Sequence, residues 1–361
     1  MTQMQPNSDD IRFEQKNRAG FITLNRPEAL NAVTDGMLSA LSAQLDVWEH
    51  DASVERVVIK AVPGRAFSAG GDIRHLYDCG VAGDFDFAFF AREYALNVRI
   101  ARFSKPYIAL VDGIAMGGGV GVSFHGSHRI GGDRMAFAMP EVGIGFFPDI
   151  GGSYLLSRLP GRLGLYLGLT GERVKRDDAL WSGLITHSVK SSDYEQLEER
   201  LSTSSSLDNA LEGLTTGDDI GSNEDGPLQA LLPWIDEAFE EANVEVILER
   251  LNAMEGGAGD KGAWASKTRT TLQQKSPTSL KIAARQIEAG ANLSIEGCMR
   301  MEYRILKRIL PGPDFYEGIR AAIIDKDGHP AWTPDAIDAV SDAVIDGYFE
   351  PLPPEHELTL P

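Results

Sequence analysis

The sequence predicts an α/β fold that is followed by a mostly helical region. Between residues 11 and 189, short β-rich runs alternate with segments whose apolar residues recur at helical spacing. After Leu201 the chain becomes rich in Ser, Thr, Gly and Asp, and from about Pro227 its apolar pattern is mostly helical. We therefore expect an α/β domain over residues 11–205 and a helical domain over residues 227–350.

The elements of the α/β part are predicted in chain order. Strands are expected at residues 21–24 and 57–59, and a buried strand at residues 107–111, because each is a short run of β-branched, aromatic or other apolar side chains. Apolar residues at helical spacing predict one helix that ends at His50 and another over residues 85–102.

The second half is predicted to begin with loops and to continue as helices. Residues 202–206 and 215–226 have loop or linker composition. Ser276 followed by Pro277 is a good helix start, with a serine cap and a proline in the first turn. Helical periodicity covers residues 228–242, 244–254, 280–289 and 295–310.

Composition excludes several classes of partner. Lys and Arg number 34 against 53 Asp and Glu, and the resulting net charge of −19 repels nucleic acid and anionic membrane. The most apolar stretch, residues 107–124, is interrupted by Asp112 and glycines, which argues against a membrane span.

The cysteines and the first residues bear on the cellular location. Cys79 and Cys298 are far apart in the sequence, and a core of this size does not require a disulfide, which favours a reducing compartment. Residues 1–10 are polar and unlike a leader. We expect a cytoplasmic protein.

Three segments carry the chemistry. Two glycine-rich turns, residues 67–73 and 116–121, can each present bare backbone N–H groups to an oxygen anion. A third segment, residues 139–152, places Glu141 and Asp149 among glycine, proline and apolar residues. Poor solvation raises the pKa of a carboxyl toward the range where it exchanges protons at neutral pH. Together these features predict an acyl-transfer or enolate-forming enzyme.

In that order, the three segments resemble the crotonase (enoyl-CoA hydratase/isomerase) superfamily, over about residues 11–333. The subgroup that the chain resembles most is the 3-hydroxyisobutyryl-CoA hydrolases. Its marks are Pro148-Asp149, the run over residues 93–97, and residues 315–320 leading to 324–327. The resemblance implies a spiral of repeated strand–strand–helix units as the α/β core, and a homo-oligomer, either a trimer or a dimer.

The resemblance also implies the roles of the site residues. Gly71 and Gly118 match the oxyanion-hole positions. One glycine-rich turn alone is better explained by a tight turn or close packing, and the presence of both turns before the Glu141 segment reverses that preference. Glu141 matches the acid that crotonases most often retain, which can act as base, acid or nucleophile. Asp149 would orient water or protonate the leaving thiolate.

Four further residues are expected at the substrate. Glu93 would accept a hydrogen bond from a 3-hydroxyl group, although periodicity alone favours a solvated helix glutamate. Ala69 and Asp72 belong to the first glycine turn, and Asp72 is expected to brace it by hydrogen bonds rather than to react. Lys326 matches a lysine that crotonases often place near the coenzyme A nucleotide.

Departures from the superfamily pattern sharpen the functional expectation. Hydratases carry a second glutamate twenty residues before Glu141, where this chain has Gly121 (141 − 20 = 121). They usually have glycine eight residues after Glu141, where this chain has Asp149 (141 + 8 = 149). The acid is relocated, as in the hydrolase subgroup, and paired-glutamate hydration is therefore not expected.

The expected activity is hydrolysis of a short branched 3-hydroxyacyl-CoA, as in valine breakdown. The alternatives are an enoyl-CoA isomerase or hydratase of fatty-acid metabolism, and a protein that binds acyl-CoA without turnover. No cofactor is expected, because coenzyme A is part of the substrate. No metal is expected either, since His125 and His128 have no third ligand at fitting spacing. Cations for the coenzyme A phosphates are sought among Arg26, Arg65, Arg74 and Lys105.

Overall fold

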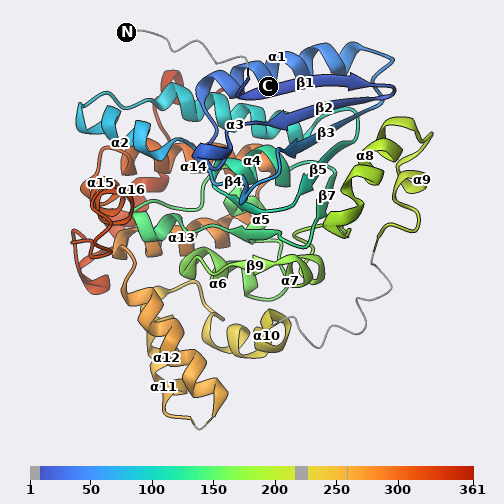
Figure 1. Ribbon diagram of the computed structural model, residues 1–361. Coiled ribbons are helices and arrows are strands. Elements are labelled where there is room, and N and C mark those ends of the chain that lie inside the picture. The colour runs from blue at the N-terminus through green and yellow to red at the C-terminus, as the bar shows by residue number, and fades with distance from the viewer. Residues whose placement is uncertain (1–8, 216–226, 258) are drawn as a thin grey trace.

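A computed structural model describes residues 9–215, 227–257 and 259–361, which form two sheets surrounded by helices (Figure 1). The larger sheet has the strand order β1-β2-β3-β5-β7-β10, and the smaller one the order β4-β6-β8-β9. The strands of the larger sheet are β1 (Ile11–Lys16), β2 (Ala19–Leu24), β3 (Arg56–Ala61), β5 (Tyr107–Val111), β7 (His128–Gly131) and β10 (His187–Ser188). Those of the smaller sheet are β4 (Ala66–Ser68), β6 (Ile114–Met116), β8 (Ala136–Ala138) and β9 (Val174–Lys175).

The chain visits the two sheets in turn, which produces the predicted strand–strand–helix spiral. The pairs β3/β4, β5/β6 and β7/β8 each place one strand in the larger sheet and the next in the smaller sheet. Within each sheet these strands pair in parallel, whereas β1–β2 and β8–β9 are antiparallel. Helical segments follow each pair, so the predicted spiral α/β core is confirmed.

Alternation along the strands divides the core between the faces of the larger sheet. Phe21, Val58 and Ile108 pack with residues of α8 (Tyr194–Thr203) and α9 (Leu207–Leu211) on one face. Their neighbours Ile22 and Val57 point to the other face and join the main core. Successive strand side chains point to opposite faces, and here both faces are covered by helices, which explains the continuous apolar runs in β2, β3 and β5.

The remaining helices match most of the predicted ones. In the first half they are α1 (Asp35–His50), α2 (Ile73–Val81), α3 (Phe87–Ala101), α4 (Gly118–Phe124), α5 (Gly152–Leu156), α6 (Leu163–Thr170) and α7 (Arg176–Trp181). In the second half they are α10 (Pro227–Ala238), α11 (Val244–Glu255), α12 (Asp260–Gln273), α13 (Pro277–Gly290), α14 (Ile295–Ile309), α15 (Pro313–Ile319) and α16 (Asp342–Phe349). As predicted, the Ser276 side chain caps α13, accepting a hydrogen bond from the Ser279 N–H.

Some local predictions were wrong or lie outside the described residues. Ser202 and Thr203 belong to α8 rather than to a loop, because both hydroxyls bond to the Glu199 carbonyl within the helix. The second glycine segment is not only a turn, since α4 begins at Gly118. The predicted linker at residues 216–226 and the polar start at residues 1–8 lie outside the described parts of the chain.

The helices of the second half pack directly on the α/β part. α13 lies against α5 and α6, and α14 lies against α3. Figure 1 shows α11 and α12 side by side, extending away from the two sheets. The main core contains residues of both halves, so the division at residues 11–205 and 227–350 stays a prediction. In residues 9–215, 227–257 and 259–361, no helix is long and apolar enough to cross a bilayer.

We expect Ile287→Ala to lower the free energy of unfolding by about 2–5 kcal/mol, because the shortened side chain leaves a cavity between α13 and α6. Ile287 is buried and its Cδ1 faces Gly168 of α6. The control is Val344→Ala on α16. Val344 is 51% exposed, so its replacement should change the free energy of unfolding by less than about 0.5 kcal/mol. Urea denaturation of both variants measures the difference, and equal small effects would contradict a shared core.

Candidate active site

The three chemistry-bearing segments lie at the carboxyl ends of three adjacent strands. Gly71 follows β4, Gly118 follows β6, and Glu141 follows β8. Because β4 pairs with β6 and β6 with β8 in parallel, their carboxyl ends meet at one edge of the smaller sheet. Segments that are far apart in the sequence are therefore brought together by strand pairing alone.

A cavity of about 340 Å³ opens at this edge. Six of the predicted site residues line it: Ala69, Gly71, Glu93, Gly118, Glu141 and Asp149. The rest of the wall is largely apolar and includes Phe89, Phe90, Phe146 and Phe315. An apolar cavity with a few convergent polar groups is the usual form of a small-molecule site.

Gly71 and Gly118 present backbone N–H groups side by side. A Cβ placed on Gly118 would lie 3.4 Å from the Gly71 nitrogen, which shows how closely the two turns approach. Gly118 is the first residue of α4, where an N–H has no partner inside the helix. Within the described residues, neither N–H donates a backbone hydrogen bond. Two unpaired donors facing a cavity have the form of an oxyanion hole.

Close packing explains why positions 118 and 121 carry glycine. A Cβ at position 118 would collide with Glu93 Oε1, so the glycine lets this carboxyl approach the N–H pair. A Cβ at position 121 would lie 2.7 Å from the buried Asn97 amide of α3. Asn97 therefore fills the space beside Gly121 that a glutamate side chain would have to enter.

Glu141 and Glu93 are buried acids with free acceptor atoms. Glu141 is 7% exposed and Glu93 is 2% exposed, so both are shielded from bulk water. Burial, followed by the charge of Asp149, raises the pKa of Glu93 to about 8 and that of Glu141 well above its usual value. Glu141 Oε2 and Glu93 Oε1 have no hydrogen-bond partner among the described residues. Buried polar atoms normally have partners, so these two oxygens are available to a substrate or a water molecule.

Asp149 is held by a tyrosine that sequence reasoning did not single out. The Tyr94 hydroxyl donates to Asp149 Oδ2 at 2.9 Å, and both residues are buried. Burial raises the pKa of Asp149 to about 7, although the Tyr94 hydrogen bond acts in the opposite direction. A carboxyl with this pKa can give or take a proton at neutral pH.

Lys275 is a second residue that the sequence analysis missed. It lines the cavity next to Gly143, where Nζ would be 3.3 Å from an added Cβ. Its ammonium group forms no salt bridge with any residue in the described parts of the chain, although the charge of Glu172 acts on it. Burial lowers the pKa of Lys275. The only signal in the sequence is its position directly before the Ser276-Pro277 helix start.

Two predicted substrate residues lie outside this cavity. The Asp72 side chain caps α2, accepting from the His75 N–H, and pairs with Arg26 at 3.8 Å, while its bracing of the glycine turn stays a prediction. Lys326 is exposed and is not among the lining residues. Lys105, one of the cations expected at coenzyme A, instead bonds to the carbonyl groups of Trp48 and Asp51.

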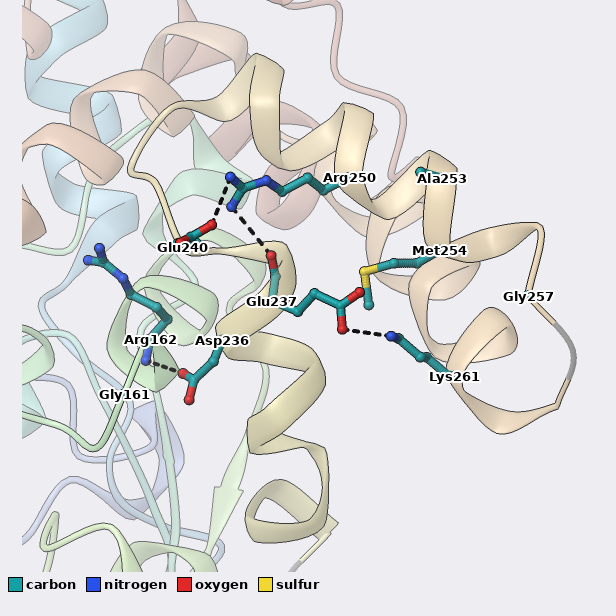
Figure 2. Close-up of a pocket in the computed structure, with 10 residues that line it drawn as sticks. All are labelled: Gly161, Arg162, Asp236, Glu237, Glu240, Arg250, Ala253, Met254, Gly257 and Lys261. Atoms are coloured by element: carbon teal, nitrogen blue, oxygen red, sulfur yellow. Dashed lines mark hydrogen bonds and ion pairs between the residues drawn. The ribbon is translucent and has the colours of Figure 1, made fainter.

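A larger hollow of about 990 Å³ lies elsewhere, beside α10, α11 and α12 (Figure 2). None of the predicted site residues lines it. Each of its three lining cations is paired with an acid: Arg162 with Glu288, Arg250 with Glu240, and Lys261 with Glu237. Because these cations are already neutralised, the hollow is poorly suited to a polyanion such as coenzyme A.

The two histidines of the sequence analysis have structural contacts. His125 Nε2 lies 2.6 Å from the Ile150 carbonyl oxygen, and His128 stacks on His187. No cluster of three or more His, Cys, Asp or Glu that could hold a metal ion occurs in residues 9–215, 227–257 and 259–361.

We expect Asp149→Asn to stabilise the protein increasingly as the pH rises from about 4 to 7. The folded-state pKa of about 7 exceeds the ordinary value of 3.8, so the folded protein binds a proton that the unfolded chain releases in this window. Wild-type stability is therefore lost as the pH rises through it, whereas asparagine does not titrate. Melting temperatures of both proteins across this range test the effect, and a difference that stays constant or shrinks would contradict it.

Comparison with known proteins agrees with this geometry. The enoyl-CoA hydratase/isomerase family model matches residues 19–349. A protein of Xenopus tropicalis named 3-hydroxyisobutyryl-CoA hydrolase, mitochondrial, is 44% identical over 340 residues, covering 92% of this chain and 87% of that protein. Its namesake in Danio rerio is 43% identical over 357 residues, covering 97% and 92%.

The fold comparison gives the same family. A crystal structure described as a carnitinyl-CoA dehydratase from Mycobacterium thermoresistibile superposes with a TM-score of 0.89 at 36% identity, covering 97% of this chain and 98% of that one. The match extends over both the strand–strand–helix core and the helices that follow it. The resemblance predicted from the glycine turns and the Glu141 segment is confirmed, and the chain belongs to the enoyl-CoA hydratase/isomerase (crotonase) family.

Proposed function

We propose that this protein hydrolyses a short branched 3-hydroxyacyl-CoA thioester, 3-hydroxyisobutyryl-CoA in the first place. The observation that carries the proposal is the acid arrangement in the cavity. Glu141 and Asp149 both line it beside the N–H groups of Gly71 and Gly118. Asn97 fills the space beside Gly121, where the paired-glutamate route to hydration would need a second acid. The names of the relatives that match nearly the full chain support the same substrate.

The first step of the proposed reaction is attack on the thioester carbonyl. Its oxygen accepts hydrogen bonds from the Gly71 and Gly118 N–H groups, which stabilise the negative charge that develops there. The Glu141 carboxylate adds to the carbonyl carbon, the carbon–sulfur bond breaks, and an anhydride forms. This step requires Glu141 to be ionised and Asp149 to be protonated, and protonation of Asp149 removes the charge that contributes to the raised pKa of Glu141. The departing thiolate then takes that proton from Asp149.

The second step returns the enzyme to its starting state. Water adds to the anhydride as Asp149, now ionised, takes one of its protons, and the bond to Glu141 breaks. The products are the free 3-hydroxy acid, coenzyme A and regenerated Glu141. In the alternative route, Glu141 removes the proton from a water that attacks the thioester directly, and the products are the same. Neither route uses a metal or a redox cofactor.

The surroundings of the reaction are part of the proposal. Lys275 supplies an unpaired ammonium group at the cavity for polyanionic coenzyme A, and exposed Lys326 contacts its nucleotide part.

The protein acts in the cytoplasm, which its two free cysteines support, and assembles as a trimer or dimer. The two relatives named above are mitochondrial by name, so cell fractionation tests the compartment and mass photometry the assembly.

Glu141→Gln should lower the rate of coenzyme A release from 3-hydroxyisobutyryl-CoA by about 10²–10⁴-fold, because the amide can act neither as nucleophile nor as base. Release is measured with a thiol reagent, and acyl-CoA affinity should change little. Hydrolysis frees the thiol, whereas isomerisation and hydration do not. If the wild-type protein converts an enoyl-CoA without freeing thiol, the proposed hydrolysis is wrong and the protein is an isomerase or hydratase. If it binds acyl-CoA without any turnover, it is a binding protein.

Glu93→Leu should remove the preference for a hydroxylated substrate. Because the pKa of Glu93 is about 8, its carboxyl is mostly neutral at neutral pH. A neutral hydrogen bond is worth about 0.5–1.5 kcal/mol, so kcat/KM for 3-hydroxyisobutyryl-CoA should fall by about 2–13-fold. The kcat/KM for isobutyryl-CoA, which lacks the hydroxyl group, should fall much less. Glu93→Gln is the matched control, since its amide can still bond to the hydroxyl. Equal losses on both substrates would show that Glu93 does not read the 3-hydroxyl group.

A further inference from the structure

The segment that carries Asp149 has an unusual backbone. Ile150, the next residue, has a φ of 52°, and Gly151 has a φ of 81°. A β-branched side chain in the left-handed region is a rare and strained conformation, which persists only where its surroundings impose it. The direction of the Asp149 side chain therefore depends on whatever holds the backbone over residues 148–153.

Buried polar side chains from three separate elements hold this backbone. Gln286 of α13 donates to the Pro148 carbonyl at 2.6 Å. His125, at the end of α4, lies 2.6 Å from the Ile150 carbonyl oxygen. Glu302 of α14 accepts from the Gly151 N–H at 2.7 Å. All three side chains are at most 8% exposed.

Glu302 makes the largest share of these bonds. Besides the Gly151 N–H, it accepts from the Ser153 N–H at 3.0 Å and from the Ser153 hydroxyl. One carboxyl thereby binds the strained turn on one oxygen and the first turn of α5 on the other. The residue is fully buried, and all three donors are uncharged.

A purely structural role is the simpler explanation of a buried, hydrogen-bonded acid, and the position of these bonds argues against it. Burying a carboxyl is costly, and an apolar residue would join α14 to α5 without that cost. The Gly151 N–H bonds to Oε2 and the Ser153 N–H to Oε1, so this arrangement uses both oxygens of the carboxyl. Those two N–H groups belong to the second and fourth residues after Asp149.

We infer that Glu302 is a positioning residue for the proposed hydrolysis. It fixes the strained turn at Ile150 and Gly151, and thereby keeps the Asp149 carboxyl in the cavity and hydrogen-bonded to the Tyr94 hydroxyl. The inference rests on the proposed function for its kinetic consequence. Its structural consequence, the place of Asp149, is independent of which reaction the cavity catalyses.

The decisive variant is Glu302→Gln, which keeps the size of the side chain but replaces one acceptor oxygen with an NH₂ group. That group would face either the Gly151 N–H or the two Ser153 donors, so the turn must shift. A displacement of about 1 Å at a reacting group can cost about 10²-fold, and we expect a loss of that order in kcat. KM for the acyl-CoA should stay nearly unchanged, since Glu302 does not line the cavity.

Asp178→Asn is the matched control. Asp178 of α7 is also a buried acid that accepts a backbone N–H, that of Leu228 at the start of α10, and it does not line the cavity. We expect both variants to lower the melting temperature and only Glu302→Gln to lower kcat. If the two variants lose stability alike and both keep wild-type kcat, Glu302 is a structural residue and the inference is wrong.

Two further measurements keep the test decisive. If Glu302→Gln does not fold, Ser153→Ala is the substitute test, because it removes one of the three donors to Glu302. The loss of one hydrogen bond should lower kcat by about 5-fold at constant KM. An unchanged kcat would overturn the inference. If the wild-type protein hydrolyses no thioester, the proposed function fails. Crystal structures of wild type and Glu302→Gln then decide the inference, since it requires Asp149 to leave the Tyr94 hydroxyl, and a retained bond would refute it.

Discussion

The parallel pairing of β4, β6 and β8 is the constraint on which the cavity depends. It aligns three strand ends, each followed by a residue of the proposed reaction: Gly71, Gly118 or Glu141. Neighbouring strands in a sheet lie about 4.8 Å apart, so the residues that follow their ends are held close together. The spiral therefore assembles the site by repeating one strand–strand–helix unit, and the three segments need not be neighbours in the sequence.

Burial raises the pKa values of the acids in this cavity and also makes their charged forms costly. Glu93, Glu141 and Asp149 share one largely apolar cavity, and each has a raised pKa because its charged form is poorly solvated. Acids so close together cannot all ionise at neutral pH, so protons are shared among them. A protein surface would keep these carboxyls ionised and unsuited to proton transfer. In the proposed reaction, the same burial that costs stability therefore brings these carboxyls into the pKa range of proton transfer.

The helices of the second half contribute to the site as well as to the core. α13 supplies Gln286 and α14 supplies Glu302, and both bond to the backbone around Asp149. Lys275, which lines the cavity, directly precedes α13. The site is therefore completed by residues from both halves of the chain, which gives a physical reason for the dense packing of α13 and α14 on α3, α5 and α6.

Local patterns in the sequence were sufficient for much of the fold. The strand at residues 107–111 coincides with β5, and the helix ending at His50 coincides with the end of α1. These predictions succeed because the period of apolar residues and the chemistry of caps are properties of a few consecutive residues. The edge strand β1 was not predicted: only Ile11 to Glu14 alternate between apolar and polar residues, and its four polar residues are all exposed.

The candidate site was predictable only in part, for the same reason. The glycine turns and the acids at Glu141 and Asp149 stand out in the sequence because glycine and buried acids form local motifs, and the resemblance assigned their roles. Glu302 did leave a sign, since it occupies the apolar face of its helix between Met299 and Leu306. Its partner Gly151 lies 151 residues away along the chain, however, and no local pattern reports such a distance. Tertiary structure alone decided that Asn97 fills the space beside Gly121, that Lys275 lines the cavity and Lys326 does not, and that Glu302 holds the turn behind Asp149, because each of these facts is a contact between segments that only the packed fold brings together.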